Sequence, residues 1–294
     1  MTGGAQTGGA HGSGAQGGGA PVRRVPVGLS TASVFPEPPA SAFEIAARMG
    51  FDGVELMVGL DRYSQDIDTI AELSRRYAVP VLAVHAPCLL ITQHVWGADP
   101  WRKLDRTREA AIRLGASVVV VHPPFAWQRQ YARTFADGIA RLSARHPTDG
   151  RQVRFAVENM FPIAIAGQSV STYRPGWRVE DGETALYGSV AFDVSHTASS
   201  ASDTLAVQAA IGPALHHLHL GDGVVDPAGR PGKDEHLVPG RGTQPCAEVL
   251  RRLPADFGGA VVLEINTRYA PTQRARRADL AESLAFTREH LGRP

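Results

Sequence analysis

Eight short apolar runs rich in β-branched residues recur along the chain, and a helical or loop stretch follows each of them. The runs cover residues 25–29, 53–57, 80–85, 117–122, 153–158, 189–193, 215–220 and 260–264. Continuous apolar strands are typical of parallel sheets that are buried on both faces. Eight such units within 294 residues predict an α/β protein whose single domain is a (β/α)8 TIM barrel.

A doubly wound open sheet is the alternative architecture. No G-x-G-x-x-G follows the first run and no G-x-x-x-x-G-K-[ST] occurs, so the nucleotide-binding signatures common in that fold are missing. Gly50 and Gly115 lie where two of the predicted helices should end. Residues 162–188 are predicted to form a long loop after the fifth strand, and long loops in compact domains often act as lids or bind ligands.

The domain organisation follows from composition. Residues 1–22 are rich in Gly, Ala, Gln, Ser and Thr, so we expect a disordered tail, with the barrel over residues 23–294. The tail lacks the basic and apolar regions of a signal peptide, and no apolar run approaches the ~20 residues that span a bilayer. With only two cysteines, a cytoplasmic protein without a membrane partner is expected. A net charge of +1 argues against a generally basic nucleic-acid coat.

Nine residues of metal-binding type stand at or just beyond the carboxyl ends of the predicted strands. In a TIM barrel these ends meet at one mouth, where the active site lies. Imidazole and carboxylate groups suit Zn²⁺, Mn²⁺, Fe²⁺ or Co²⁺, and burying so many together without a cation would be costly. Since nine ligands exceed the needs of one ion, we predict two or three ions with a bridging carboxylate, bound by His85, His122, Glu158, Asp193, His196, His219, Asp234, His236 and Glu264.

Not every histidine is expected at this centre, because a lone histidine is more often an ordinary core or surface residue. His216 and His217 flank the ligand of the seventh strand, and one of them must point away from the barrel axis, so neither is predicted to bind metal. Cys88 is expected to be a small buried apolar residue. Four further histidines are expected to be solvated: His11, His94, His146 and His290.

In chain order, the motifs VHAP, VHPP, VEN, FDVSH, HLHLGD, DEHLVPGRG and LEI resemble the xylose-isomerase-like TIM barrel superfamily over residues 25–291. This superfamily holds sugar phosphate isomerases and epimerases together with abasic-site endonucleases of the endonuclease IV type. Resemblance to the isomerases implies one divalent ion, held by Glu158, Asp193, His219 and Glu264.

Resemblance to the endonucleases implies three zinc ions. The first would be held by His85, His122 and a bridging Glu158, the second by the four residues of the isomerase site, and the third by His196, Asp234 and His236. The chain departs from the endonuclease pattern after Glu158, where it reads MFPIAIAG, and at Arg241, where an acidic residue is usual. Both departures disfavour DNA cleavage.

The leading functional hypothesis is a metal-dependent isomerase or epimerase of a sugar, sugar phosphate or keto-acid, with zinc or manganese as the cofactor and one to three ions. Glu158 and Glu264 would exchange a proton beside the carbonyl through a metal-stabilised enediolate, while His196 would hold a substrate hydroxyl. Arg241 could bind a phosphate or carboxylate. Glu55 could contact substrate, hydrogen-bond a ligand histidine, or be inert.

The alternative hypothesis is a zinc-dependent abasic-site endonuclease, and DNA is a partner only in this case. Its candidate DNA-binding segment is residues 125–135, in which aromatic and basic side chains alternate: Trp127, Arg129, Tyr131 and Arg133. The simpler interpretation of this segment is an ordinary amphipathic helix on the barrel exterior. A barrel that binds metal or ligand without catalysis is a third possibility. Substrate identity and oligomeric state are not encoded in any motif of the chain.

Overall fold

The structure, a computed structural model, describes residues 1–3, 24–145, 152–165, 168–170, 172–173, 186–226, 228 and 232–292. Apart from its first three residues, the predicted tail of residues 1–22 lies outside the described residues, as do His11 and His146. Among the described helices, none is long and apolar enough to cross a membrane.

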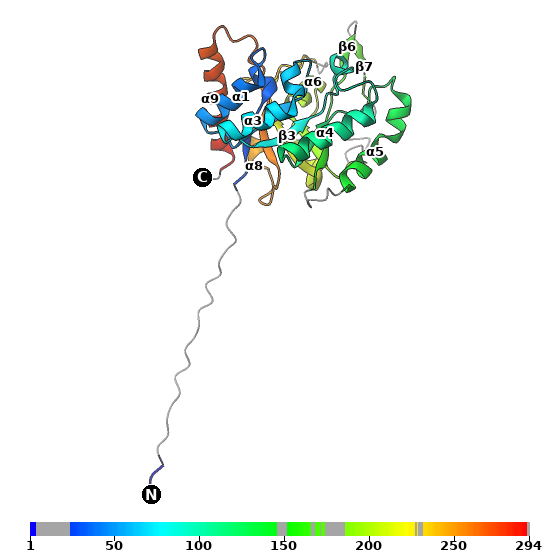
Figure 1. Cartoon of the computed structure of the whole chain (residues 1–294). Coiled ribbons are helices and arrows are strands. Elements are labelled where there is room, and N and C mark those ends of the chain that lie inside the picture. The colour runs from blue at the N-terminus through cyan, green and yellow to red at the C-terminus, as the bar shows by residue number, and fades with distance from the viewer. Residues whose placement is uncertain are drawn as a thin grey trace.

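Eight parallel strands close into a barrel with helices around it, which confirms the predicted TIM barrel (Figure 1). Neighbouring strands follow the order β1-β10-β9-β8-β5-β4-β3-β2. Each lies within one of the predicted apolar runs or extends one residue past it. The strands are β1 (Val27–Ser30), β2 (Gly53–Met57), β3 (Val81–His85), β4 (Val118–Val121), β5 (Arg154–Glu158), β8 (Val190–Asp193), β9 (Leu215–Leu220) and β10 (Ala260–Leu263).

Helices cover the outside of the barrel, and α1, α3 and α4 pack side by side along it (Figure 1). Gly50 and Gly115 end α1 and α4 with φ angles of 79° and 74°, which confirms both predicted helix ends. The helices are α1 (Pro39–Met49), α2 (Arg62–Gln65), α3 (Ile67–Tyr77), α4 (Pro100–Leu114), α5 (Arg129–Ala144), α6 (Val194–Ser200), α7 (Thr204–Ile211), α8 (Cys246–Arg251) and α9 (Gln273–His290), with short 3-10 turns η1 (Thr31–Val34), η2 (Leu90–Thr92) and η5 (Gly212–Ala214).

The segment 162–188 differs from the prediction of a plain long loop. It contains an antiparallel hairpin of β6 (Ile163–Ile165) and β7 (Gln168–Val170), and Phe125 forms an isolated bridge with Tyr173 beyond it. Residues 174–185 of this segment lie outside the described part of the chain.

The barrel interior is built in layers because alternate residues of a strand face the same side. Small side chains fill the lower interior, where Ala83, Val118, Val120, Ala156 and Ala191 form one buried cluster. The larger apolar residues of the same strands face outward and pack under the helices in the main core. Two residues beyond Ala83, Ala156 and Ala191, the interior positions carry polar groups. The fold therefore gathers chemistry at the carboxyl end of the barrel.

Candidate metal centre

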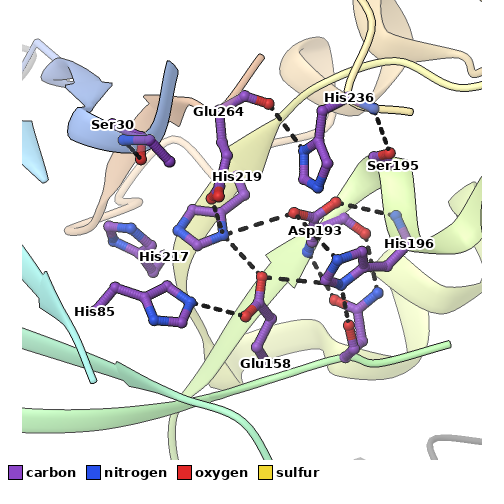
Figure 2. A network of polar contacts seen from close by, with 12 residues as sticks. Ser30, His85, Glu158, Asp193, Ser195, His196, His217, His219, His236 and Glu264 are labelled. Atoms are coloured by element: carbon purple, nitrogen blue, oxygen red, sulfur yellow. Dashed lines mark hydrogen bonds and ion pairs between the residues drawn. The ribbon is translucent and has the colours of Figure 1, made fainter. Parts of the chain in front are cut away.

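A carboxylate at the centre of the mouth joins the predicted ligand residues. Glu158, the last residue of β5, is 2% exposed. Its Oε2 lies 3.2 Å from Nε2 of His85 at the end of β3, and 2.8 Å from Nε2 of His122 just beyond β4. These three side chains converge closely enough to share one cation. His85 and Glu158 are seen facing each other in Figure 2.

The second predicted group meets at the other oxygen of the same carboxylate. Nδ1 of His219 lies 2.8 Å from Oε1 of Glu158, 3.6 Å from Oδ2 of Asp193 and 3.1 Å from Oε2 of Glu264. One ligand atom from each of the four residues lies within 4.8 Å of the others. Figure 2 shows the four side chains pointing toward a common point between β5, β8, β9 and β10.

The third predicted group lies beside Asp193. His196 stands on the first turn of α6, where its backbone N–H donates to Oδ1 of Asp193. Oδ2 of Asp234 lies 3.0 Å from Nε2 of His236 and 3.6 Å from Nε2 of His196. Asp193, His196 and His236 form a further set with metal-binding geometry. Eight of the nine predicted ligand residues therefore fall in three adjacent sets, two of which share Glu158. The ninth, Asp234, lies beside the third set, in which Asp193 takes the place predicted for it.

Residues outside the predicted set hold this arrangement in place. Asn159 bonds to both backbone groups of Asp193: its Oδ1 accepts the N–H at 2.7 Å and its Nδ2 donates to the carbonyl at 2.9 Å. Ser195 Oγ donates to Asp234 and accepts the backbone N–H of His236. Neither residue stood out in the sequence, because amides and hydroxyls next to a ligand are common for many other reasons.

A buried pair lies directly beneath the cluster. Glu55 is 0% exposed, and its carboxylate contacts Nε2 of His217 at 2.7 Å and Nε2 of His219 at 3.0 Å. Glu55 therefore lies behind His219, away from the open mouth. His217 was not predicted from the sequence to belong to the site. The two-residue periodicity of a strand does indicate it, because His217 and His219 must face the same side, the barrel interior. His216 points outward and is half-buried.

Two other sequence candidates lie away from the cluster. Arg241 is bound by Asp279 at 2.8 Å and by Glu282 on α9, so its charge is already paired. In the aromatic and basic segment, residues from Arg129 onward form α5, and Tyr131 packs against Trp101 at 4.9 Å. Trp127 is 55% exposed and stacks on Phe125. The segment is thus largely an exterior helix.

The pKa values of two carboxyl groups of the centre, Glu158 and Glu264, are shifted in opposite directions. Burial alone would raise the pKa of Glu158, but the charges of His219 and His122 outweigh it and hold that pKa well below its ordinary value. At Glu264 burial prevails over His219 and His236, and the pKa is raised. Although burial opposes it, Asp193 and Asp234 raise the pKa of His196 to about 10. The pKa values of His219 and His236 are raised in the same way by neighbouring carboxylates, whereas burial lowers the pKa of His122.

The chemistry of the donor set fits a divalent cation. Oδ2 of Asp193 and Oε2 of Glu264 are buried, and no group in the described part of the chain donates a hydrogen bond to either. Both atoms face Nδ1 of His219, together with Glu158. Buried anionic oxygens without donors are costly, and a cation bound among three carboxylates and an imidazole would satisfy them.

A cavity of about 570 Å³ opens over one side of the centre. It reaches Asp234, His236 and Glu264, and its side-chain walls include the exposed apolar residues Phe35, Leu60, Leu89 and Ile91. Arg268 also lines it and stacks over Tyr269 at 4.6 Å. The volume lies within the roughly 300–1,000 Å³ of typical small-molecule sites.

Comparison with known proteins agrees with this geometry. Residues 43–290 match the family model described as xylose isomerase-like TIM barrel. The chain belongs to the xylose isomerase-like TIM barrel family. An uncharacterised protein of Mycobacterium tuberculosis (strain H37Rv) is 51% identical over 91% of this chain and 98% of its own length. An uncharacterised protein of Mycobacterium leprae (strain TN) is 48% identical over the same shares of the two chains.

Solved structures of the family share the fold at low sequence identity. A D-tagatose 3-epimerase-like protein has a TM-score of 0.62 and 22% identity, covering 90% of this chain and 98% of that one. A D-allulose 3-epimerase from Methylomonas sp. has a TM-score of 0.62 and 16% identity over 91% and 97%. The IOLI protein with a bound zinc atom has a TM-score of 0.65 and 17% identity over 91% and 98%.

Proposed function

We propose that the protein is a divalent-metal-dependent isomerase or epimerase of a sugar, sugar phosphate or keto-acid. The observation that carries the proposal is that two carboxyl groups contact the same histidine nitrogen and have pKa values shifted in opposite directions. Glu158 and Glu264 lie 2.8 Å and 3.1 Å from Nδ1 of His219, with the pKa of the first lowered and that of the second raised. Two carboxyl groups whose pKa values are shifted in opposite directions are suited to act as acid and base in a proton transfer.

The ion would be zinc or manganese, held by Glu158, Asp193, His219 and Glu264. When bound, a divalent cation supplies Lewis acidity, which polarises a carbonyl and favours loss of a proton from the neighbouring carbon. The fit rests on the buried oxygens of Asp193 and Glu264, to which no group in the described part of the chain donates a hydrogen bond. That the cavity reaches Glu264 supports access by a small molecule.

The protein's own side chains would carry the proton. Glu264 has a 13% exposed side chain and a raised pKa, so it would take up and return the proton beside the substrate carbonyl. Glu158, which lies at the same nitrogen of His219 as Glu264, would assist in the transfer. His196 would donate from Nε2 to a substrate hydroxyl, because its Nδ1 is already bound to the carbonyl of Asn159.

The test is proton exchange in D2O. We expect the manganese- or zinc-loaded protein to replace the hydrogen next to the carbonyl of at least one compound in a panel of D-fructose, D-allulose and D-tagatose, with and without a terminal phosphate, and of sugar-derived keto-acids. Proton NMR would follow the loss of the C–H signal. Glu264→Gln should slow the exchange by about 100-fold or more, since a positioned acid–base group contributes at least that much.

Glu282→Gln is the matched control, because Glu282 is an exposed carboxylate of α9 that is bound to Arg241 away from the centre. It should exchange at the wild-type rate. Exchange at an unchanged rate in Glu264→Gln would remove Glu264 from the mechanism. Absence of exchange on neutral, phosphorylated and keto-acid substrates alike would contradict the proposed function.

One observation favours abasic-site phosphodiester cleavage as a second candidate. The sets His85–His122–Glu158 and Asp193–His196–His236 flank the four-residue set, so the mouth has ligands for three ions. Clustered ions suit hydrolysis of phosphodiesters. Zinc-dependent cleavage of a duplex with one abasic site, abolished by His236→Asn, would support this candidate, and DNA would then be a partner. An intact duplex after incubation with the zinc-loaded protein would eliminate it.

A further inference from the structure

The five histidines predicted to bind metal differ in how the second ring nitrogen is satisfied. Metal-binding histidines almost always use this nitrogen to donate to a carboxylate, a carbonyl or a water. Three of the five have a hydrogen-bonded protein partner for it, and a fourth, His219, has a carboxylate beside it without hydrogen-bond geometry. Nδ1 of His85 bonds to Ala86 O, Nδ1 of His196 to Asn159 O and Nδ1 of His236 to Glu264 O, while Nε2 of His219 lies 3.0 Å from Glu55.

The second nitrogen of His122 has neither a hydrogen bond nor an ion pair in the described part of the chain. Its Nε2 faces Glu158 at 2.8 Å, and the residue is only 5% exposed. Its Nδ1 is buried and has no hydrogen-bond partner in the described part of the chain. An unsatisfied polar atom of this kind costs about 1–3 kcal/mol, so the environment of His122 should supply an acceptor.

A small cavity adjoins His122 on the flank of the barrel. Its volume is about 40 Å³, which exceeds the ~10–15 Å³ that one water needs. Among its walls are the side chains of Cys88, Lys103, Gln128 and Tyr131. It adjoins the large cavity over Glu264, because Ala86, Pro87, Cys88 and Leu89 border both.

Lys103 brings a buried positive charge to this cavity. The residue, on α4, is 8% exposed, and its Nζ donates to Thr92 O at 3.0 Å and Pro87 O at 3.5 Å. No carboxylate lies within ion-pair distance among the residues that the structure describes. Burial raises the pKa of the Cys88 thiol to about 11, so Cys88 is neutral near pH 7 and offers no counter-charge.

Lys103 and Gln128 bring unused N–H donors to the lining of the cavity. A lysine ammonium has three N–H groups, and two of those on Lys103 are used. Gln128 already accepts the backbone N–H of Phe125 through Oε1, which leaves its amide N–H groups. A water could accept from His122, but it would leave the charge of Lys103 uncompensated. A small anion would satisfy both.

We propose that this cavity is a binding site for a small monovalent anion of about the size of chloride, held between Lys103 and His122. The anion accepts from Nδ1 of His122 and so plays the part that Glu55 plays for His219. It fixes the ring with Nε2 toward Glu158 and makes that nitrogen a better ligand. The site does not depend on which reaction the protein catalyses.

Bromide replaces chloride and can be located by its anomalous scattering, so the direct test uses crystals of the wild-type chain grown with sodium bromide. We expect an anomalous peak in the cavity, within hydrogen-bonding distance of Lys103 Nζ and His122 Nδ1. A cavity that contains a water without anomalous signal, or no density, would overturn the proposal. This test needs no variant and no substrate.

A second test compares zinc affinity in chloride and in methanesulfonate, a larger anion, by competition with a chelator. Wild-type protein should bind zinc several-fold to tenfold more tightly in chloride after correction for chloride binding to free zinc, and should melt at a higher temperature in chloride. Lys103→Met should lose both responses. Lys233→Met, at the only other lysine of the chain, should retain them. Equal responses in the two variants would contradict the assignment of Lys103.

Discussion

Substitution of Glu55 tests whether its buried carboxylate holds His219 in position for metal binding. Its two oxygens contact Nε2 of His217 at 2.7 Å and Nε2 of His219 at 3.0 Å, in a place with no exposure to solvent. These contacts leave Nδ1 of His219 toward Glu158, Asp193 and Glu264. In Glu55→Gln the amide has one oxygen, so only one of the two histidines keeps its acceptor and the other meets an N–H group.

The size of the effect follows from these contacts. Loss of the outer partner of a metal-binding histidine weakens metal binding by about 10- to 100-fold, which is about 1.4–2.7 kcal/mol. The metal-free protein should also lose about 3–5 kcal/mol of stability, because removing one partner of a buried charge pair leaves the other uncompensated. Burial would raise the pKa of Glu55, but the histidine charges hold it well below its ordinary value, so the carboxylate is ionised near neutral pH.

Zinc affinity of Glu55→Gln would be measured by competition with a chromogenic chelator, and stability by urea unfolding of the metal-free chain. Glu44→Gln is the control, because Glu44 pairs with Arg48 on the surface of α1 at 3.0 Å. It should match wild type in both assays, since exposed ion pairs contribute little. A folded Glu55→Gln that binds zinc as tightly as wild type would refute the supporting role of Glu55.

Three further predictions concern pH, packing and the paired arginine. Zinc affinity should rise from pH 6.5 toward 10, because zinc needs neutral imidazole and the pKa of His196 in the metal-free protein is about 10; a flat profile in chelator competition would contradict this. Gly138→Ala should lower stability by about 1–3 kcal/mol in urea unfolding, since a Cβ there would overlap the ring of Trp101, and an unchanged midpoint would show that the ring can move aside. Arg241→Ala should leave kcat/KM unchanged in the exchange assay, because Asp279 and Glu282 already bind its guanidinium; a large rise in KM would return Arg241 to the substrate site.

The barrel could be predicted from the sequence because its strands are short, continuous apolar runs, which are typical of strands buried on both faces of a parallel sheet. The predicted run 53–57 coincides with β2, and 215–220 coincides with β9. Closure of eight parallel strands then brings their carboxyl ends together, which is why ligand residues as far apart as His85 and Glu264 could be assigned to one mouth. The hairpin in 162–188 was missed because strands of three residues each are too short to show a recognisable periodicity.

Other parts of the site depend on contacts that periodicity does not encode. Arg241 lies in a turn between two glycines, and only the three-dimensional path of that turn brings it to α9 and away from the mouth. The partner of His217 is Glu55, 162 residues away in sequence, on a strand that lies across the barrel. Such pairs require the register of the whole sheet, which local sequence patterns do not specify.

The central claim is that Glu158, Asp193, His219 and Glu264 share a divalent cation. It is tested most directly by metal analysis of the purified, dialysed protein, combined with anomalous diffraction at the absorption edge of the metal that is found. The account predicts from one to about three ions per chain, with the four-residue set occupied first. A well-folded protein that neither contains nor takes up zinc or manganese, or one that binds them only outside this set, would contradict it.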